Sequence, residues 1–121
     1  MKINRFEDLE IWKISVQIAV DIFEVCKEKP LKNDFGTKDQ IQRAAFSLSN
    51  NISEGFEYDN NADFIRYLRY AKGSAGELRS QMFVLKNAGL ISETFYNQKY
   101  SELIALSIKI KNLMTYLQNK K

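Results

Sequence analysis

The sequence predicts an all-α fold, an antiparallel up-down-up-down four-helix bundle built by one domain over residues 1–121. Apolar residues recur three and four positions apart over most of the chain, and four segments carry helix start and stop signals. The links between these segments are short, which makes neighbouring helices antiparallel. We expect the four helices over residues about 6–27, 38–54, 61–88 and 93–118.

The first helix starts beside Asn4, with Glu7 three residues later, and ends before Pro30. It carries two apolar stripes, about 130° apart at ~100° per residue. We expect one stripe to face the core of the bundle: Leu9, Trp12, Val16, Ala19, Phe23 and Cys26. The other stripe predicts contact with a second copy of the chain, unless the loop around Leu31 and Phe35 covers it: Ile11, Ile14, Ile18, Ile22 and Val25.

The second helix begins at a capping-box spacing, Thr37 to Gln40, and Gly55 is suited to end it in a left-handed conformation. Small residues fill much of this helix, and a polar set runs along it. We expect this set to form a buried hydrogen-bond network that fixes the register of the helices, with an acid–base site as the alternative: Gln40, Arg43, Ser47, Asn51 and Glu54.

The third helix opens at the polar stretch 59–61 and closes at Gly89, and the fourth opens at Ser92. Gly73 and Gly76 lie inside the third helix, where each glycine costs roughly 1 kcal/mol relative to alanine. Both point away from the core stripe of that helix, so they predict close approach of another subunit. The alternative is a kink that contacts no partner.

Composition excludes several classes of function. The chain has no histidine and one cysteine, which leaves no disulfide framework, thiolate–histidine zinc site or histidine-dependent catalysis. We expect no catalytic residue, no metal and no cofactor, and therefore no enzyme. No apolar run approaches the ~20 residues of a membrane span, and the N-terminus lacks the apolar region of a secretion signal. A cytoplasmic location is the expectation.

Charge is distributed unevenly along the chain. Residues 1–63 hold 8 basic and 12 acidic side chains, a formal charge of −4, whereas residues 64–121 hold 10 and 3, a charge of +7. Basic residues follow the third helix and predict a surface for a nucleic-acid backbone, either RNA or DNA: Arg66, Arg69, Lys72, Arg79 and Lys86. The alternative is an ordinary solvated face.

Two tyrosines, Tyr67 and Tyr70, are interleaved with these arginines. Their rings are suited to stack on unpaired bases. Tyrosines at helical spacing also commonly line the contact between two helices, which is the alternative interpretation.

Four motifs stand in a specific order along the chain: Phe6-Glu7-Asp8-Leu9-x-x-Trp12, Gln40-Ile41-x-Arg43-Ala44-Ala45-x-Ser47, Asn51-Ile52-Ser53-Glu54-Gly55, and Phe64 through Ala71-x-Gly73-Ser74-x-x-Glu77-Leu78. This pattern resembles the four-helix-bundle proteins encoded in intervening sequences of bacterial 23S ribosomal RNA genes, over nearly the whole chain. The resemblance implies an up-down bundle that assembles as a homopentamer. It also extends to accessory proteins of diversity-generating retroelements, and so implies a reverse transcriptase as partner and nucleic-acid binding through basic residues.

The resemblance supplies no catalytic residue. Seven residues match the polar and glycine pattern of the family, and we expect them in the structural polar network and in packing: Gln40, Arg43, Asn51, Glu54, Gly73, Ser74 and Glu77. In the loop after Gly55, Glu57 and Asp59 stand where relatives often carry a basic residue. These acids weaken phosphate binding at this end of the bundle and leave the row on the third helix as the better candidate.

Two functions of different classes follow. The first is a non-enzymatic homo-oligomer that binds RNA or DNA as an accessory factor. The second is a structural or scaffolding module that binds another protein through apolar surface and has no nucleic-acid role.

Overall fold

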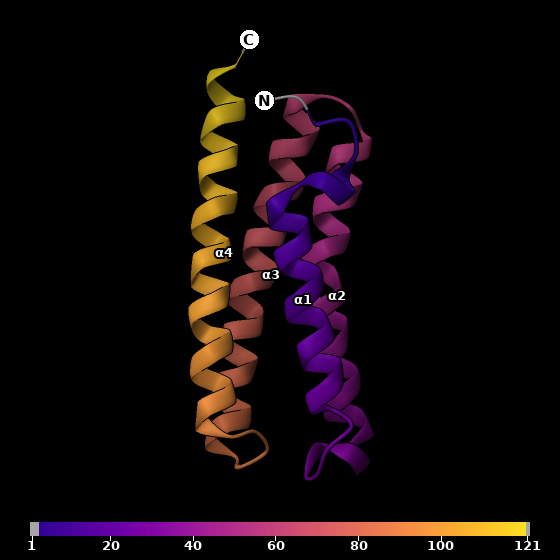
Figure 1. Cartoon of the computed structure of the whole chain (residues 1–121), viewed down its shortest axis with the longest axis vertical. Coiled ribbons are helices and arrows are strands. Elements are labelled where there is room, and N and C mark those ends of the chain that lie inside the picture. Colours follow the sequence, from indigo (N-terminus) through magenta and orange to yellow (C-terminus); the bar gives the residue numbers. More distant parts are fainter. Residues whose placement is uncertain (1–2, 121) are drawn as a thin grey trace.

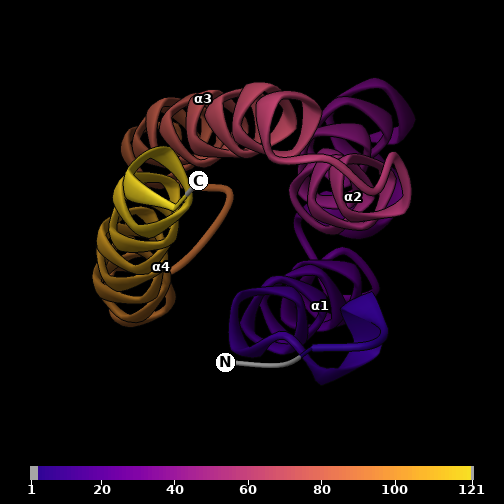
Figure 2. The ribbon, with the colours of Figure 1, turned by 90° about the horizontal axis from the view of Figure 1, so that it is seen from above.

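The computed structural model describes residues 3–120, which form four long helices in up-down-up-down order (Figure 1). The helices lie around the bundle in chain order, so each packs against its neighbours in the sequence (Figure 2). No strand occurs within residues 3–120, which confirms the predicted all-α class. The elements are η1 (Phe6–Asp8), α1 (Glu10–Val25), η2 (Leu31–Asn33), α2 (Phe35–Glu57), α3 (Asn61–Asn87) and α4 (Glu93–Asn119).

The starts of α3 and α4 carry the predicted caps. The backbone N–H of Asp63 donates to Oδ1 of Asn60 at 2.8 Å, and that of Phe95 donates to Oγ of Ser92 at 3.0 Å. Each bond satisfies an amide that has no partner inside its helix. Gly89, just beyond α3, has a φ of +78°, the left-handed conformation expected of a glycine there.

The first two helices start at different residues from those expected. α1 begins at Glu10 instead of residue 6, because residues 6–8 form the separate turn η1 and Leu9 is extended. α2 begins at Phe35 because the carboxylate of Asp34 accepts from the N–H of Thr37 at 3.2 Å. Asp34 is therefore the cap of α2, and the predicted capping box at Thr37 was wrong.

Gly55 does not end α2, which continues to Glu57. The left-handed residue of the turn is Asp59, with a φ of 61°. A Cβ on Gly55 would lie 2.5 Å from Cβ of Tyr67 on α3, a distance that real atoms do not tolerate. Gly55 is therefore a packing residue that lets α2 and α3 approach closely.

The core of the bundle takes the isoleucine stripe of α1, contrary to the prediction. Ile11, Ile18 and Ile22 are buried within the single chain, with 0% of Ile22 exposed, so they are not available to a second copy; Ile14 is half-buried. They pack with buried residues of the other helices, among them Leu48, Ile52, Leu68, Leu78, Leu103, Leu106 and Ile110.

The other stripe of α1 is buried only in part. Leu9, Ala19 and Cys26 are buried as predicted, but Trp12 and its neighbours turn toward a surface groove between α1 and α2. This α1–α2 groove has a volume of about 570 Å³ and is mostly apolar. Its apolar lining comprises Phe6, Trp12, Val16, Ala19, Val20, Phe23 and Phe46.

An ion pair joins the first and last helices. Nζ of Lys99 on α4, 1% exposed, donates to Asp21 on α1 and, at 2.8 Å, to Glu102. Burial by itself lowers the pKa of Lys99, but the hydrogen bonds to Asp21 and Glu102 outweigh it and raise this pKa above its ordinary value. The lysine thus stays charged and holds α1 against α4. Across residues 3–120, no helix is long and apolar enough to cross a membrane.

Candidate nucleic-acid interface

The five basic residues predicted to bind nucleic acid wind around α3 instead of sharing one face. Arg66, Arg69 and Lys72 are exposed, whereas Arg79 and Lys86 are half-buried beside α4. At ~100° per residue, the first and last of them stand about 160° apart around the helix. The row is therefore divided between the outer face of α3 and the contact with α4.

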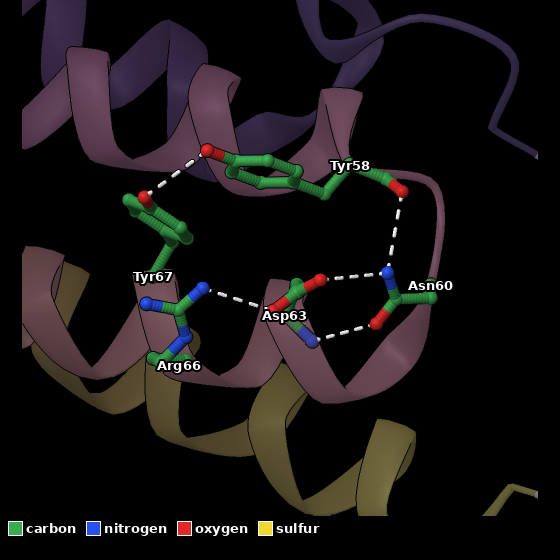
Figure 3. A network of polar contacts seen from close by, with 5 residues as sticks. All are labelled: Tyr58, Asn60, Asp63, Arg66 and Tyr67. Atoms are coloured by element: carbon green, nitrogen blue, oxygen red, sulfur yellow. Dashed lines mark hydrogen bonds and ion pairs between the residues drawn. The ribbon is translucent and has the colours of Figure 1, made fainter.

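The N-terminal end of the row belongs to a polar network at the turn between α2 and α3 (Figure 3). Nη2 of Arg66 lies 2.9 Å from Oδ1 of Asp63, whose Oδ2 accepts from Nδ2 of Asn60 at 2.8 Å. The hydroxyl of Tyr67 donates to that of Tyr58 at 3.4 Å, and the guanidinium of Arg66 lies 4.9 Å from the centre of the Tyr67 ring. These contacts hold the turn and the first two turns of α3 together.

The pKa shifts in this network keep Asp63 and Arg66 charged, and their ion pair intact, near neutral pH. Hydrogen bonds from Asn60 and then Arg66 lower the pKa of Asp63, and the bond to Asp63 raises the pKa of Arg66. The hydrogen bond to Tyr58, with a smaller contribution from burial, raises the pKa of Tyr67 to about 12, so its hydroxyl keeps its proton. Because Asp63 offsets the charge of Arg66, this end of the row is less attractive to phosphate than the sequence suggested.

Cations and aromatic rings alternate at the other end of α3, where it packs on α4. We call this cluster the α3–α4 seam: Arg79, Phe83 and Lys86 of α3 with Tyr96 and Tyr100 of α4. Nζ of Lys86 lies 4.6 Å from the ring centre of Tyr96 and 5.0 Å from that of Phe83. The guanidinium carbon of Arg79 lies 5.9 Å from the ring centre of Tyr100. Both cations therefore rest on aromatic rings, the arrangement of a cation–π contact.

Four of the five basic residues have no acidic partner in the described part of the chain. Within residues 3–120, no carboxylate lies within ion-pair distance of Arg69, Lys72, Arg79 or Lys86. Their charge is thus not offset locally, in contrast to that of Arg66.

The tyrosines interleaved with the arginines have different surroundings. Tyr67 packs against Gly55 and stacks on Tyr58, with ring centres 5.3 Å apart, so it lines the contact between α2 and α3. Tyr70 stays exposed and meets Tyr67 edge to face. The sequence interpretation missed the α3–α4 seam, although Tyr96 and Tyr100 stand four residues apart on α4 and so share a helical face.

Four residues expected in the buried polar network are exposed. Gln40, Arg43, Glu54 and Glu77 are all exposed, and Arg43 pairs only with its neighbour Asp39 at 3.0 Å. A charged or amide side chain at these positions reaches water more easily than a partner inside the bundle, where full desolvation is costly.

The polar contact that does join α2 to α3 uses smaller residues. Oγ of Ser47 donates to Oγ of Ser74 at 2.7 Å, and Nδ2 of Asn51 donates to the carbonyl of Ser47 at 2.8 Å. Gly73 and Gly76 lie nearby on α3, where an added Cβ would meet nothing within 4 Å. Their role in contacting another subunit stays a prediction.

A model of the family described as 23S rRNA-intervening sequence protein matches residues 7–112. No curated protein matches the chain. Among solved structures, the chain is similar to the crystal structure, at 1.70 Å resolution, of a protein of unknown function from the S23 ribosomal protein family of Bacteroides thetaiotaomicron VPI-5482. The two share 21% identity and a TM-score of 0.77, over 86% of this chain and 97% of that one, which shows a common fold. Because the family model spans most of its length, the chain belongs to the 23S rRNA-intervening sequence protein family.

Proposed function

We propose that this chain is a non-enzymatic, homo-oligomeric protein that binds nucleic acid as an accessory factor. The observation that carries the proposal is the excess charge of +7 over residues 64–121, which includes four cations on α3 without an acidic partner among residues 3–120. Such cations attract phosphates and release the counterions that surround them, without any base-specific geometry. Assembly of several copies multiplies the effect.

The only cysteine gives no support to covalent catalysis. Cys26 is buried, and burial raises the pKa of its thiol despite the opposing effects of Gln42 and Lys38. A thiol of raised pKa stays protonated near neutral pH and is a poor nucleophile. The absence of histidine from the sequence removes the commonest general base as well.

Charge reversal on α3 tests the nucleic-acid function. In the double variant Arg69→Glu/Lys72→Glu, we expect affinity for RNA or DNA to fall at least tenfold at low salt, because both side chains are exposed and unpaired. The matched control is Lys13→Glu/Arg43→Glu, which makes the same charge change at exposed positions of α1 and α2. Equal loss of binding in both variants, measured by fluorescence anisotropy, would contradict a specific role for α3.

The homo-oligomeric part of the proposal is supported by the α1–α2 groove. Val20 and Phe46 of this groove are 46% and 52% exposed, and an apolar patch of this kind is typical of an interaction surface. Its occupant in the proposal is a second copy, because burial of this groove between copies leaves the exposed cations of α3 free on the outside of the assembly. The groove replaces the isoleucine stripe as the expected interface.

Sedimentation tests this assembly. The wild-type chain should sediment as an oligomer at micromolar concentration, and Val20→Glu/Phe46→Glu should shift it to a monomer. The control Tyr116→Glu changes an exposed position near the C-terminal end of α4 and should leave the mass of the oligomer unchanged. A wild-type monomer would contradict the oligomer and favour the second candidate function, a scaffold whose α1–α2 groove binds another protein.

A further inference from the structure

The α3–α4 seam leaves large aromatic rings open to solvent. Phe83 is 48% exposed and Tyr100 is 43% exposed, although neighbouring positions on both helices are buried. The rings form a continuous series, with centres 6.0 Å apart from Phe83 to Tyr96 and 5.8 Å apart from Tyr96 to Tyr100. Two helices thus place two exposed rings, the half-buried ring of Tyr96 between them and two half-buried cations on one side of the bundle.

We propose that the α3–α4 seam binds an unpaired segment of nucleic acid, with bases stacked on Phe83, Tyr96 and Tyr100 and phosphates beside Arg79 and Lys86. This inference rests on the proposed nucleic-acid function and names its substrate class and its site. The seam combines the two elements of a single-strand surface, a positive charge that follows the backbone and aromatic faces that accept any base.

The rings distinguish an unpaired strand from a duplex. In a duplex the faces of the bases are covered by their neighbours, so only unpaired bases have faces to offer to Phe83 or Tyr100. Successive nucleotides of one strand in a duplex are ~3.4 Å apart along the helix axis. The ring centres of the seam are about 6 Å apart, which is wider than this spacing. Each ring therefore matches a separate, splayed base.

The cations of the seam are suited to phosphate. Neither Arg79 nor Lys86 has a carboxylate within ion-pair distance among the described residues, and both are positioned by the aromatic rings beneath them. The acidic residues nearest in sequence to the two tyrosines are Glu93 and Glu102. Glu93 forms no ion pair with Lys86, and Glu102 pairs with Lys99 at 2.8 Å. A phosphate would thus meet cations that are held in place and not neutralised.

Fluorescence anisotropy with a 20-nucleotide single strand, as RNA and as DNA, and with the matched duplex tests the proposal. The variant Phe83→Leu/Tyr100→Leu removes two rings but keeps apolar side chains. We expect it to weaken single-strand binding about tenfold or more, while duplex binding changes less than threefold. The control Tyr116→Leu removes a similarly exposed tyrosine at the other end of α4. Nζ of Lys120 lies 5.3 Å from the centre of its ring, so this position also pairs a ring with a cation. Both affinities should stay unchanged in this variant.

The outcomes separate this proposal from the function on which it rests. One outcome is that the wild-type chain binds nucleic acid and Phe83→Leu/Tyr100→Leu binds the single-stranded RNA, the single-stranded DNA and the duplex as tightly as the wild-type chain does. In that case the seam is not the site, and the proposed function survives. If the wild-type chain binds none of these nucleic acids, both proposals fail. If Phe83→Leu/Tyr100→Leu loses its helical circular-dichroism signal, Arg79→Gln/Lys86→Gln is measured in its place. A salt dependence of single-strand binding equal to that of the wild-type chain would then overturn the assignment of the seam as the binding site.

Discussion

Single residues decide how closely the helices of this bundle approach one another. Gly55 is the clearest case, because its missing side chain makes room for Tyr67 of α3. The sequence interpretation assigned Gly55 to a helix end, since a glycine after a polar helix is a common stop signal. Only the contact with a residue twelve positions away reveals its packing role, and no local pattern encodes that contact.

Substitution of this glycine should destabilise the fold. In Gly55→Ala the new Cβ would stand 2.5 Å from that of Tyr67, so the two helices must move apart. We expect the free energy of unfolding to fall by roughly 1–3 kcal/mol. Gly73→Ala, also inside a helix but facing open space, should instead raise it by about 0.5–1 kcal/mol. Urea denaturation of both variants checks the pair, and destabilisation of equal size would contradict the account.

At the scale of helices, the periodicity of apolar residues predicted the number, type and order of the elements but not the rotation of α1. Both of its stripes are apolar enough to face a core. The choice between them depends on how α1 meets α2 and α4, and the sequence of α1 does not contain that information. Ser15 illustrates this, because it shares the face of Ile11, Ile18 and Ile22 and is fully buried although it is polar, with its hydroxyl donating to the carbonyl of Ile11 at 2.7 Å.

The candidate site was predictable to a similar degree. The cations of α3 were found from charge and spacing, since charge is visible in the sequence. The α3–α4 seam required knowledge of which turns of α3 and α4 meet, and that pairing is set by packing of the whole bundle. The polar network was predicted only in part: Ser47 and Asn51 are half-buried and hydrogen-bonded, but Gln40, Arg43, Glu54 and Glu77 are exposed, because polar spacing alone does not tell whether a side chain is buried.

The contact between α1 and α4 depends on the ion pair of Lys99 with Asp21. Burial by itself raises the pKa of Asp21, but hydrogen bonds from Lys99 and Gln17 outweigh it and lower this pKa below the ordinary 3.8. The carboxylate of Asp21 therefore stabilises the fold above about pH 4. This contribution is lost as the pH falls through the lowered pKa that Asp21 has in the folded state. The raised pKa of Lys99 has its effect at alkaline pH. The stability that the charged lysine contributes is lost only as the pH rises above the ordinary lysine pKa of 10.5.

Removal of this carboxylate should weaken the junction of the two helices. We expect Asp21→Asn to lower the free energy of unfolding by roughly 1–3 kcal/mol at pH 7, because Lys99 keeps only Glu102 as a charged partner. The variant should also lose less stability than the wild-type chain between pH 4 and pH 2. Glu10→Gln breaks the exposed contact of Lys109, 3.4 Å long, between the same helices and should cost less than about 1 kcal/mol. Thermal denaturation across this pH range distinguishes the two variants.

At the scale of the whole molecule, the division of charge matters more than any single contact. The first half of the chain, at −4, forms α1 and α2, and the second half, at +7, lies almost entirely in α3 and α4. Since consecutive helices are neighbours in this bundle, a division along the sequence becomes a division between two sides of the molecule (Figure 2). One side thus carries the α1–α2 groove and the other carries the α3–α4 seam.

Titration of the wild-type chain with a fluorescent single-stranded RNA at about 50 and 200 mM salt tests whether the basic side of the bundle binds nucleic acid. We expect binding at the lower salt and a loss of affinity of at least tenfold at the higher salt, because phosphate contacts release counterions. Absence of binding at the lower salt, or an affinity that does not change with salt, would contradict a nucleic-acid role for the basic side of the bundle.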